Sequence, residues 1–284
     1  GARFLDIGRE LERHGLILLT MTSGKGGTLA GWMATGGMGF GTYHHGPVKN
    51  QLISIRVITP DGKIKNIAAE DPEITYFLST EGQMGILVKA TLRVGRKPSR
   101  WFPVIMPFED PFSAYAFAKK LSDHPSIRPD ELVVYHSEFV RALKAQSNGK
   151  ISVEDKNLVM VAFSDEGAAR DLKAYLAQNG IQAADEASAN TLWEERFLPM
   201  SIKHLVPSLL ATEVLLPLDQ AASYHQKITG WGKRLGLTFY PTSHLINRDQ
   251  VLFLAMLATD HRKAIFYADR MLVPMMVRLA VQFY

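Results

Sequence analysis

The first 97 residues alternate between apolar segments and short polar or glycine-rich connections. Phe4, Ile7 and Leu11 recur at helical spacing, with Gly15 as the stop, and residues 16–19 form an apolar run that predicts a strand. Residues 52–58 are rich in β-branched side chains, a Pro-Asp-Gly turn follows at 59–62, and residues 63–67 are predicted to return as a strand. Apolar residues at every second position of 86–94 predict a half-buried strand with one apolar face.

Beyond Arg96-Lys97-Pro98 the pattern changes to strands alternating with helices, without glycine clusters. This change divides the chain into predicted domains of residues 1–97 and 98–284. Strands are predicted at 211–216, 237–246 and 251–257, with a helix at 218–235 and a final helix near Asp260. A β-α-β-β-α order is typical of ferredoxin-like sheets. The prediction is therefore an α+β fold whose second domain is an antiparallel sheet covered by helices.

Composition and charge exclude several classes of site and partner. The 284 residues are 46% hydrophobic and carry a net charge of +4, without a basic block, so no nucleic-acid partner is predicted. The absence of cysteine excludes disulfides, thiolate zinc sites and iron–sulfur ligation by this chain. No apolar run reaches the roughly 18 residues that a membrane span needs. We expect a soluble, cytoplasmic protein, with a homo-oligomer as one candidate state. Both ends look cut from a longer chain.

The glycine-rich segment at residues 24–46 raises the question of a nucleotide site. It fails the P-loop pattern, because Gly26 follows Lys25 and a leucine stands at position 19. Gly37, Gly39 and Gly41 fall one residue short of the Rossmann pattern, and no helix is predicted between Gly41 and Leu52. Two interpretations stay open. Residues 27–46 form either an extended loop array whose N–H groups hold a flat charged cofactor, or a run of tight turns without a ligand. In the first, glycine is needed because a Cβ would keep the backbone from the ligand.

Three blocks in order then resemble FAD-linked oxidases of the vanillyl-alcohol oxidase (PCMH) type, a family that includes glycolate oxidase subunit, D-lactate dehydrogenases and alkyl-dihydroxyacetone-phosphate synthase. The blocks are Thr28 to Gly37 with Gly46, the strand and turn at 52–62, and Glu81-Gly82-Gln83-Met84-Gly85-Ile86-Leu87. The resemblance implies the second half of a PCMH-type FAD-binding domain, followed by a cap domain that is incomplete at its C-terminus. It implies FAD contacts at Thr22, Ser23, Thr28, Ala30, Gly31, Thr35, Gly36, Gly37, Gly46, Glu81, Gly82, Gly85 and Ile86.

The sequence departs from the family pattern in ways that bear on the cofactor. Ala30 replaces the first glycine of a pair, and Gln83-Met84 replaces a small hydroxyl residue and leucine. The family's first FAD subdomain, with its own pyrophosphate loop, should lie before Gly1. We therefore expect this chain to bind FAD weakly or not at all without that subdomain.

Candidate catalytic chemistry centres on His244. It matches the first histidine of the G-H-x-G-D-G-N-x-H motif of hydroxy-acid dehydrogenase cap domains, and the resemblance implies a general base. Val251 stands where the second histidine should be, so no metal is expected there. Arg248 is a candidate for binding a substrate carboxylate, and Tyr43 and His44 are candidate substrate contacts. A structural or solvated role is the alternative for each. We find no informative partners for His136 or His225, and residues 194–196 are predicted to be a solvated helix face.

Together these features predict an FAD-dependent oxidoreductase that oxidises a small 2-hydroxy acid or alcohol, with hydride transfer to flavin N5 and electrons leaving to a partner protein or oxygen. The alternative is a non-catalytic subunit that serves as an interaction module in a larger electron-transfer assembly.

Overall fold

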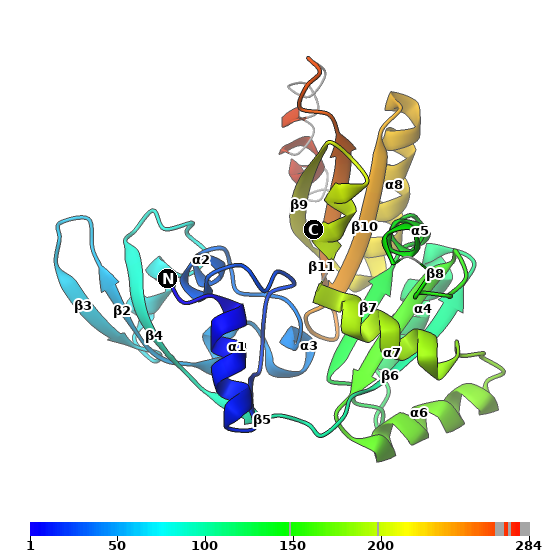
Figure 1. Cartoon of the computed structure of the whole chain (residues 1–284), viewed down its shortest axis with the longest axis horizontal. Helices are drawn as coiled ribbons and strands as arrows, with labels where there is room; N and C mark the ends of the chain where they lie inside the picture. The colour runs from blue at the N-terminus through cyan, green and yellow to red at the C-terminus, as the bar shows by residue number, and fades with distance from the viewer. Residues whose placement is uncertain (148, 198, 265–269, 272–273, 279–284) are drawn as a thin grey trace. The chain divides into compact units, whose positions relative to one another are not determined.

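A computed structural model describes residues 1–147, 149–197, 199–264, 270–271 and 274–278 (Figure 1). The chain divides into two compact units, residues 1–99 and 100–284. Part of the expected final helix near Asp260 lies outside the described residues. Residues 261–264, which are described, form turns.

Unit 1 contains a three-stranded sheet in the order β3-β2-β4 and a small β1-β5 pair. The strand predicted at 52–58 is present with those bounds as β2. The elements are α1 (Phe4–Arg13), β1 (Leu16–Leu18), α2 (Leu29–Ala34), α3 (Thr42–His45), the 3-10 helix Val48–Gln51, β2 (Leu52–Ile58), β3 (Ile64–Ala68), the 3-10 helix Pro72–Phe77, β4 (Ile86–Leu92) and β5 (Val94–Arg96).

The core of unit 1 lies between the inner face of this sheet and α2. Ile55, Val57 and Ile67 of the sheet are buried against Met33 of α2 and Phe77. Asp71 caps the start of the 3-10 helix, because its side chain accepts a hydrogen bond from the N–H of Glu73. The sheet therefore supports the loops on either side of α2.

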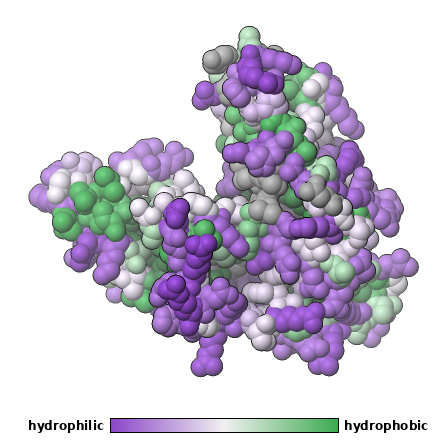
Figure 2. All heavy atoms as spheres, in the orientation of Figure 1, coloured by the Kyte–Doolittle hydropathy of each residue, from purple (hydrophilic) through white to green (hydrophobic). Residues whose placement is uncertain are grey.

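The prediction of one apolar inward face on β4 is wrong. Arg56 of β2 pairs with Lys89 and the next residue, Val57, pairs with Leu87, so Val88 is the extra residue of a β-bulge. The bulge shifts the alternation, so Leu87 and Ala90 pack on the core while Ile86 and Val88 are exposed. Ile86, Ile58 and Ile64 form a cross-strand row on the outer face, where Figure 2 shows apolar side chains gathered over the sheet.

Unit 2 contains a six-stranded sheet in the order β6-β8-β7-β10-β11-β9, and each pair of neighbouring strands among the described residues is antiparallel. This confirms the predicted antiparallel sheet and the α+β class. The elements are β6 (Phe102–Phe108), α4 (Pro111–Ser122), β7 (Glu131–Tyr135), α5 (Ser137–Gln146), β8 (Asn157–Phe163), α6 (Glu166–Gln178), α7 (Glu186–Glu194), 3-10 helices at Glu195–Phe197, Pro199–His204 and Leu218–Gln220, β9 (Ser208–Pro217), α8 (Ala221–Leu235), β10 (Thr238–Leu245) and β11 (Gln250–Thr259).

The sheet of unit 2 consists of two halves with the same topology. In the first half, residues 102–163, strand β8 lies between β6 and β7; in the second half, residues 208–259, strand β11 lies between β9 and β10. Each is a split β-α-β arrangement. The halves join through β7 and β10, which pair at Tyr135–Thr242, Val134–Ser243 and Val133–His244. This three-residue junction includes His244.

Candidate functional site

The glycine-rich segment of unit 1 is not the extended array that we expected. It contains α2 and α3, and the 3-10 helix Val48–Gln51 follows, so the expectation of no helix between Gly41 and Leu52 is wrong. Gly41 at φ 84° and Gly46 at φ 75° flank the single turn of α3. Because glycine adopts positive φ without steric cost, the chain can enter and leave so short a helix abruptly.

Several glycines of this segment are required by the protein's own packing. A Cβ would lie 2.0 Å from Val48 Cγ1 at Gly37, 2.4 Å from the Met21 carbonyl oxygen at Gly39, and 2.0 Å from the Leu19 carbonyl oxygen at Gly41. Internal packing therefore explains the glycines at these three positions, and a nearby ligand is not required to explain them. Gly24, Gly26 and Gly82 differ, because a Cβ there would meet nothing closer than about 4 Å.

The loop at residues 22–26 has the donors that an anionic group needs. Within the described parts of the chain, the main-chain N–H groups of Thr22, Ser23 and Gly26 have no hydrogen-bond acceptor. Gly24 donates to the hydroxyl of Thr22 at 3.3 Å, which holds the turn. Successive N–H groups in such a turn form an anion-binding concavity. These residues therefore fit a phosphate group of FAD.

The structure brings the third block against the first and beside the turn of the second. Glu81 donates its main-chain N–H to the Ala34 carbonyl at 2.8 Å, so the 79–82 loop docks on the end of α2. Ser79 and Glu81 have positive φ, which is uncommon for residues with a side chain and indicates a constrained loop. Gly82, Gly85 and Ile86 line an open hollow of about 390 Å³ beside the 59–62 turn. Gly85 is also required internally, since a Cβ would lie 2.6 Å from the Ile58 carbonyl oxygen.

The remaining predicted cofactor and substrate contacts of unit 1 have mainly structural partners. Thr28 caps α2 by accepting from Gly31, and Thr35 donates its hydroxyl to the Trp32 carbonyl at 3.1 Å. Gly36 and Ala30 are half-buried, and Tyr43 and His44 lie on α3. Their proposed ligand contacts stay predictions.

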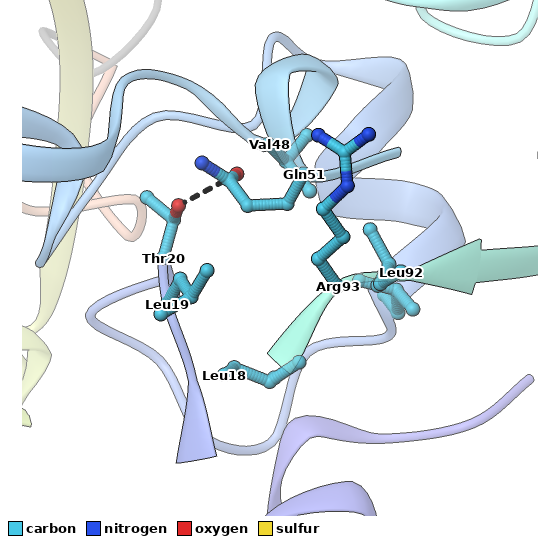
Figure 3. Close-up of a pocket in the computed structure, with 8 residues that line it drawn as sticks. Leu18, Leu19, Thr20, Val48, Gln51, Leu92 and Arg93 are labelled. Carbon is cyan, nitrogen blue, oxygen red and sulfur yellow. Dashed lines mark hydrogen bonds between the residues drawn. The ribbon is translucent and has the colours of Figure 1, made fainter. Parts of the chain in front are cut away.

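A buried polar contact behind this segment is structural. Thr20 donates to the side-chain oxygen of Gln51 at 2.9 Å, and Gln51 donates to the His45 carbonyl at 2.7 Å (Figure 3). The cavity that Thr20 and Gln51 help to line has a volume of about 10 Å³. Since a single water needs at least about 10–15 Å³, this cavity excludes any part of a cofactor.

In unit 2, His244 lies near the end of β10, close to the β10–β11 turn, as predicted. It is 8% exposed, and its Nδ1 lies 3.5 Å from Oε1 of Glu131, which is 1% exposed. Because residues two apart on a strand share a face, Glu131 and Tyr135 of β7 lie on the same face as Thr242 and His244. Glu213 of β9, which is exposed, also lies on this face through the Thr242–Leu254–Glu213 row.

Arg248 is separate from this buried pair. It is exposed in the β10–β11 turn, where Asn247 accepts from the N–H groups of Asp249 and Gln250 at 2.9 and 2.8 Å. Val251 is buried in β11, paired with Leu245, and cannot ligate a metal.

A half-buried arginine near Glu131, Arg196, was not predicted from the sequence. The guanidinium of Arg196 lies 3.7 Å from the Trp193 ring centre and 4.2 Å from that of Phe197, and it donates to the Trp193 carbonyl. Burial lowers the pKa of Arg196 to about 10, and the carboxylates of Glu131 and Glu194 oppose this shift. The expected solvated helix face is therefore wrong for Arg196. Aromatic residues at 193 and 197 were the available signal, because guanidinium groups stack on such rings.

Comparison with known proteins finds a match within unit 1. Residues 1–68 match the family model described as an FAD binding domain. The recognition of the family from the glycine blocks is confirmed, and FAD is the cofactor that this domain indicates.

Relatives extend the similarity beyond this domain. The chain is 28% identical over 128 residues to alkyldihydroxyacetonephosphate synthase of Trypanosoma brucei brucei, covering 42% of this chain and 21% of that protein. It is 26% identical over 248 residues to the mitochondrial D-lactate dehydrogenase [cytochrome] 1 of Saccharomyces cerevisiae, covering 78% of this chain and 41% of that protein. The chain thus spans less than half the length of these relatives.

Solved structures share the fold. An alkyldihydroxyacetonephosphate synthase superposes with a TM-score of 0.71 at 18% identity, covering 98% of this chain and 57% of that one. The 4-ethylphenol oxidase of Gulosibacter chungangensis superposes with a TM-score of 0.73 at 12% identity, covering 99% of this chain and 65% of that one. Among the described residues no helix is long and apolar enough to cross a membrane. The cytoplasmic location stays a prediction.

Proposed function

We propose that this protein is an FAD-dependent oxidoreductase that oxidises a small 2-hydroxy acid or alcohol, with His244 as the general base. The observation that supports this most is the buried pair of His244 and Glu131 at 3.5 Å. The relative named D-lactate dehydrogenase supports a 2-hydroxy acid as substrate. Neither the relatives nor the structural neighbours support the non-catalytic alternative.

Glu131 orients the imidazole of His244. With Nδ1 facing the carboxylate, Nε2 is the nitrogen that takes the proton from the substrate hydroxyl. A buried carboxylate beside a histidine fixes the tautomer and stabilises the imidazolium that forms. When bound, FAD supplies the acceptor for the carbon-bound hydride.

The cofactor is held by the loops of unit 1. The N–H groups of Thr22, Ser23 and Gly26 bind a phosphate, and the hollow beside Gly82, Gly85 and Ile86 takes the adenosine end. Tyr43 and His44 contact the substrate, and Arg248 binds its carboxylate as a charged, bidentate donor. An electron-acceptor protein or oxygen reoxidises the cofactor.

The test is the absorbance of purified protein after loading with FAD. The proposal predicts a flavin spectrum that is bleached without oxygen by one or more 2-hydroxy acids or alcohols. Protein that retains FAD but is not bleached by any of a panel of these compounds would contradict the substrate class. Because this chain alone is expected to bind FAD weakly or not at all, the test uses protein supplied with the first FAD subdomain. Failure to retain FAD at millimolar concentration even then would contradict the cofactor site.

A further inference from the structure

A second group of buried polar side chains lies across the junction between the two halves of the unit 2 sheet, on the face opposite His244. We call Tyr115, His136, Glu138, His225 and Ser243 the back cluster. Val134 and Ser243 pair across the junction and share one face, while Val133 and His244 share the other. Ser243 is therefore next to His244 in sequence but points to the opposite side.

The back cluster links the halves through a chain of short contacts. The hydroxyl of Tyr115 lies 2.5 Å from Ser243 Oγ and 3.0 Å from His136 Nε2. Tyr115 and His136 belong to the first half and Ser243 to the second. All three are at most 3% exposed, so water does not compete for these hydrogen bonds.

A second link runs through the two histidines. The rings of His136 and His225 stack in parallel, with centroids 3.9 Å apart and an interplanar angle of 7°. His225 of α8 also lies 3.6 Å from the carboxylate of Glu138 on α5. The back cluster thus connects α4, α5 and α8 to strand β10 at the residue beside His244.

The proposed catalytic pair crosses the same junction. Glu131 belongs to β7 of the first half and His244 to β10 of the second, so their 3.5 Å separation depends on how the halves pair. Only three residue pairs join β7 and β10 in the described structure. Side-chain contacts on the back must therefore contribute much of the restraint at this point.

We infer that Tyr115 and Ser243 are positioning residues, which hold β10 against β7 and thereby set His244 against Glu131. This inference rests on the proposed function only in the use made of His244. The geometry of the back cluster does not involve the cofactor or the substrate. A catalytic role for Tyr115 itself is not implied, since it lies on the opposite face of the sheet.

The test compares Tyr115→Phe with Tyr224→Phe in the full chain. Tyr224 is a matched control, because it is equally buried and its hydroxyl donates to the Met276 carbonyl, outside the back cluster. Tyr115→Phe removes the hydrogen bonds to Ser243 and His136. Each is worth about 0.5–1.5 kcal/mol, so amide hydrogen exchange at residues 133–135 and 242–244 should accelerate by at least roughly fivefold. Tyr224→Phe should leave exchange at these residues unchanged.

A second readout follows the imidazole itself. Nitrogen-15 spectra of histidine-labelled protein, with His244 assigned by a His244→Gln variant, should show one Nδ1–H tautomer in the wild type and a mixture in Tyr115→Phe. Ser243→Ala should reproduce both effects, and the double variant should add little, because both substitutions remove the same bond. Equal exchange and an unchanged tautomer in Tyr115→Phe and Tyr224→Phe would overturn the inference.

The two proposals can fail separately. If His244→Ala does not affect turnover while Tyr115→Phe changes exchange and tautomer as expected, the proposed general base is wrong and the positioning by Tyr115 stands. If turnover depends on His244 but Tyr115→Phe leaves the exchange rates and the tautomer unchanged, only the positioning inference is wrong.

Discussion

Replacing Gly41 by alanine tests whether the glycines of unit 1 are required by internal packing. Gly41 has φ of 84°, and a Cβ would lie 2.0 Å from the Leu19 carbonyl oxygen, a backbone atom that cannot rotate away. The left-handed conformation costs alanine about 1–2 kcal/mol, and overpacking costs typically about 1–3 kcal/mol. The expected destabilisation of the 19–21 and 39–41 segments is therefore about 2–5 kcal/mol.

Hydrogen exchange with mass spectrometry measures this locally. Peptides covering residues 16–22 and 38–46 should exchange at least roughly 30-fold faster in Gly41→Ala, which corresponds to about 2 kcal/mol. Gly26→Ala is the matched control, because its Cβ would meet nothing within 4 Å, and it should change these rates little. Unchanged exchange in Gly41→Ala, or an equal change in Gly26→Ala, would refute the packing explanation.

Three other predictions address the N-cap of α4, the pH dependence of stability and the proposed catalytic pair of Glu131 and His244. Asp110→Ala should destabilise unit 2 by about 1 kcal/mol in urea unfolding, because Asp110 caps α4 by accepting from the N–H of Ser113 at 2.9 Å. An unchanged free energy of unfolding would show that this cap does not stabilise unit 2. Burial, with the neighbouring His225, holds the pKa of His136 well below its usual 6.5. The unfolded chain therefore binds a proton that the folded one does not. The free energy of unfolding is highest above pH 6.5 and falls by up to about 1.4 kcal/mol per pH unit below it. In His136→Gln this dependence on pH should be absent between pH 5 and 6.5. Glu131→Gln should lower turnover at unchanged FAD absorbance, and unaltered turnover would show that the carboxylate does not assist His244.

The sequence predicted the elements of unit 1 better than their faces. β-Branched residues and a Pro-Asp-Gly turn located β2 and its hairpin, because both signals are local. The bulge at Val88 depends on how β4 pairs with β2, so the alternation of residues 86–94 could not show which side chains point inward. The extended loop expected at 27–46 was wrong for a related reason, since positive φ at Gly41 and Gly46 permits a helix of one turn.

The candidate site was predicted in part. His244 was found from its resemblance to a family motif, and it lies where the hairpin places it. Glu131 is 113 residues away in sequence and becomes its neighbour only when β7 pairs with β10. His136 and His225 had no informative spacing for the same reason, because their stacking depends on packing of α8 beside the start of α5. Tertiary pairing of this kind leaves no periodic signal in the sequence.

As the proposed general base, His244 removes the proton from the substrate hydroxyl. This role is tested most directly by the rate of anaerobic flavin bleaching in FAD-loaded His244→Ala, mixed rapidly with a 2-hydroxy acid that bleaches the unaltered protein. The expected rate is lower by about 10²–10⁴-fold, the usual contribution of a general base, with an unchanged flavin spectrum before mixing. A bleaching rate equal to that of the unaltered protein would contradict it.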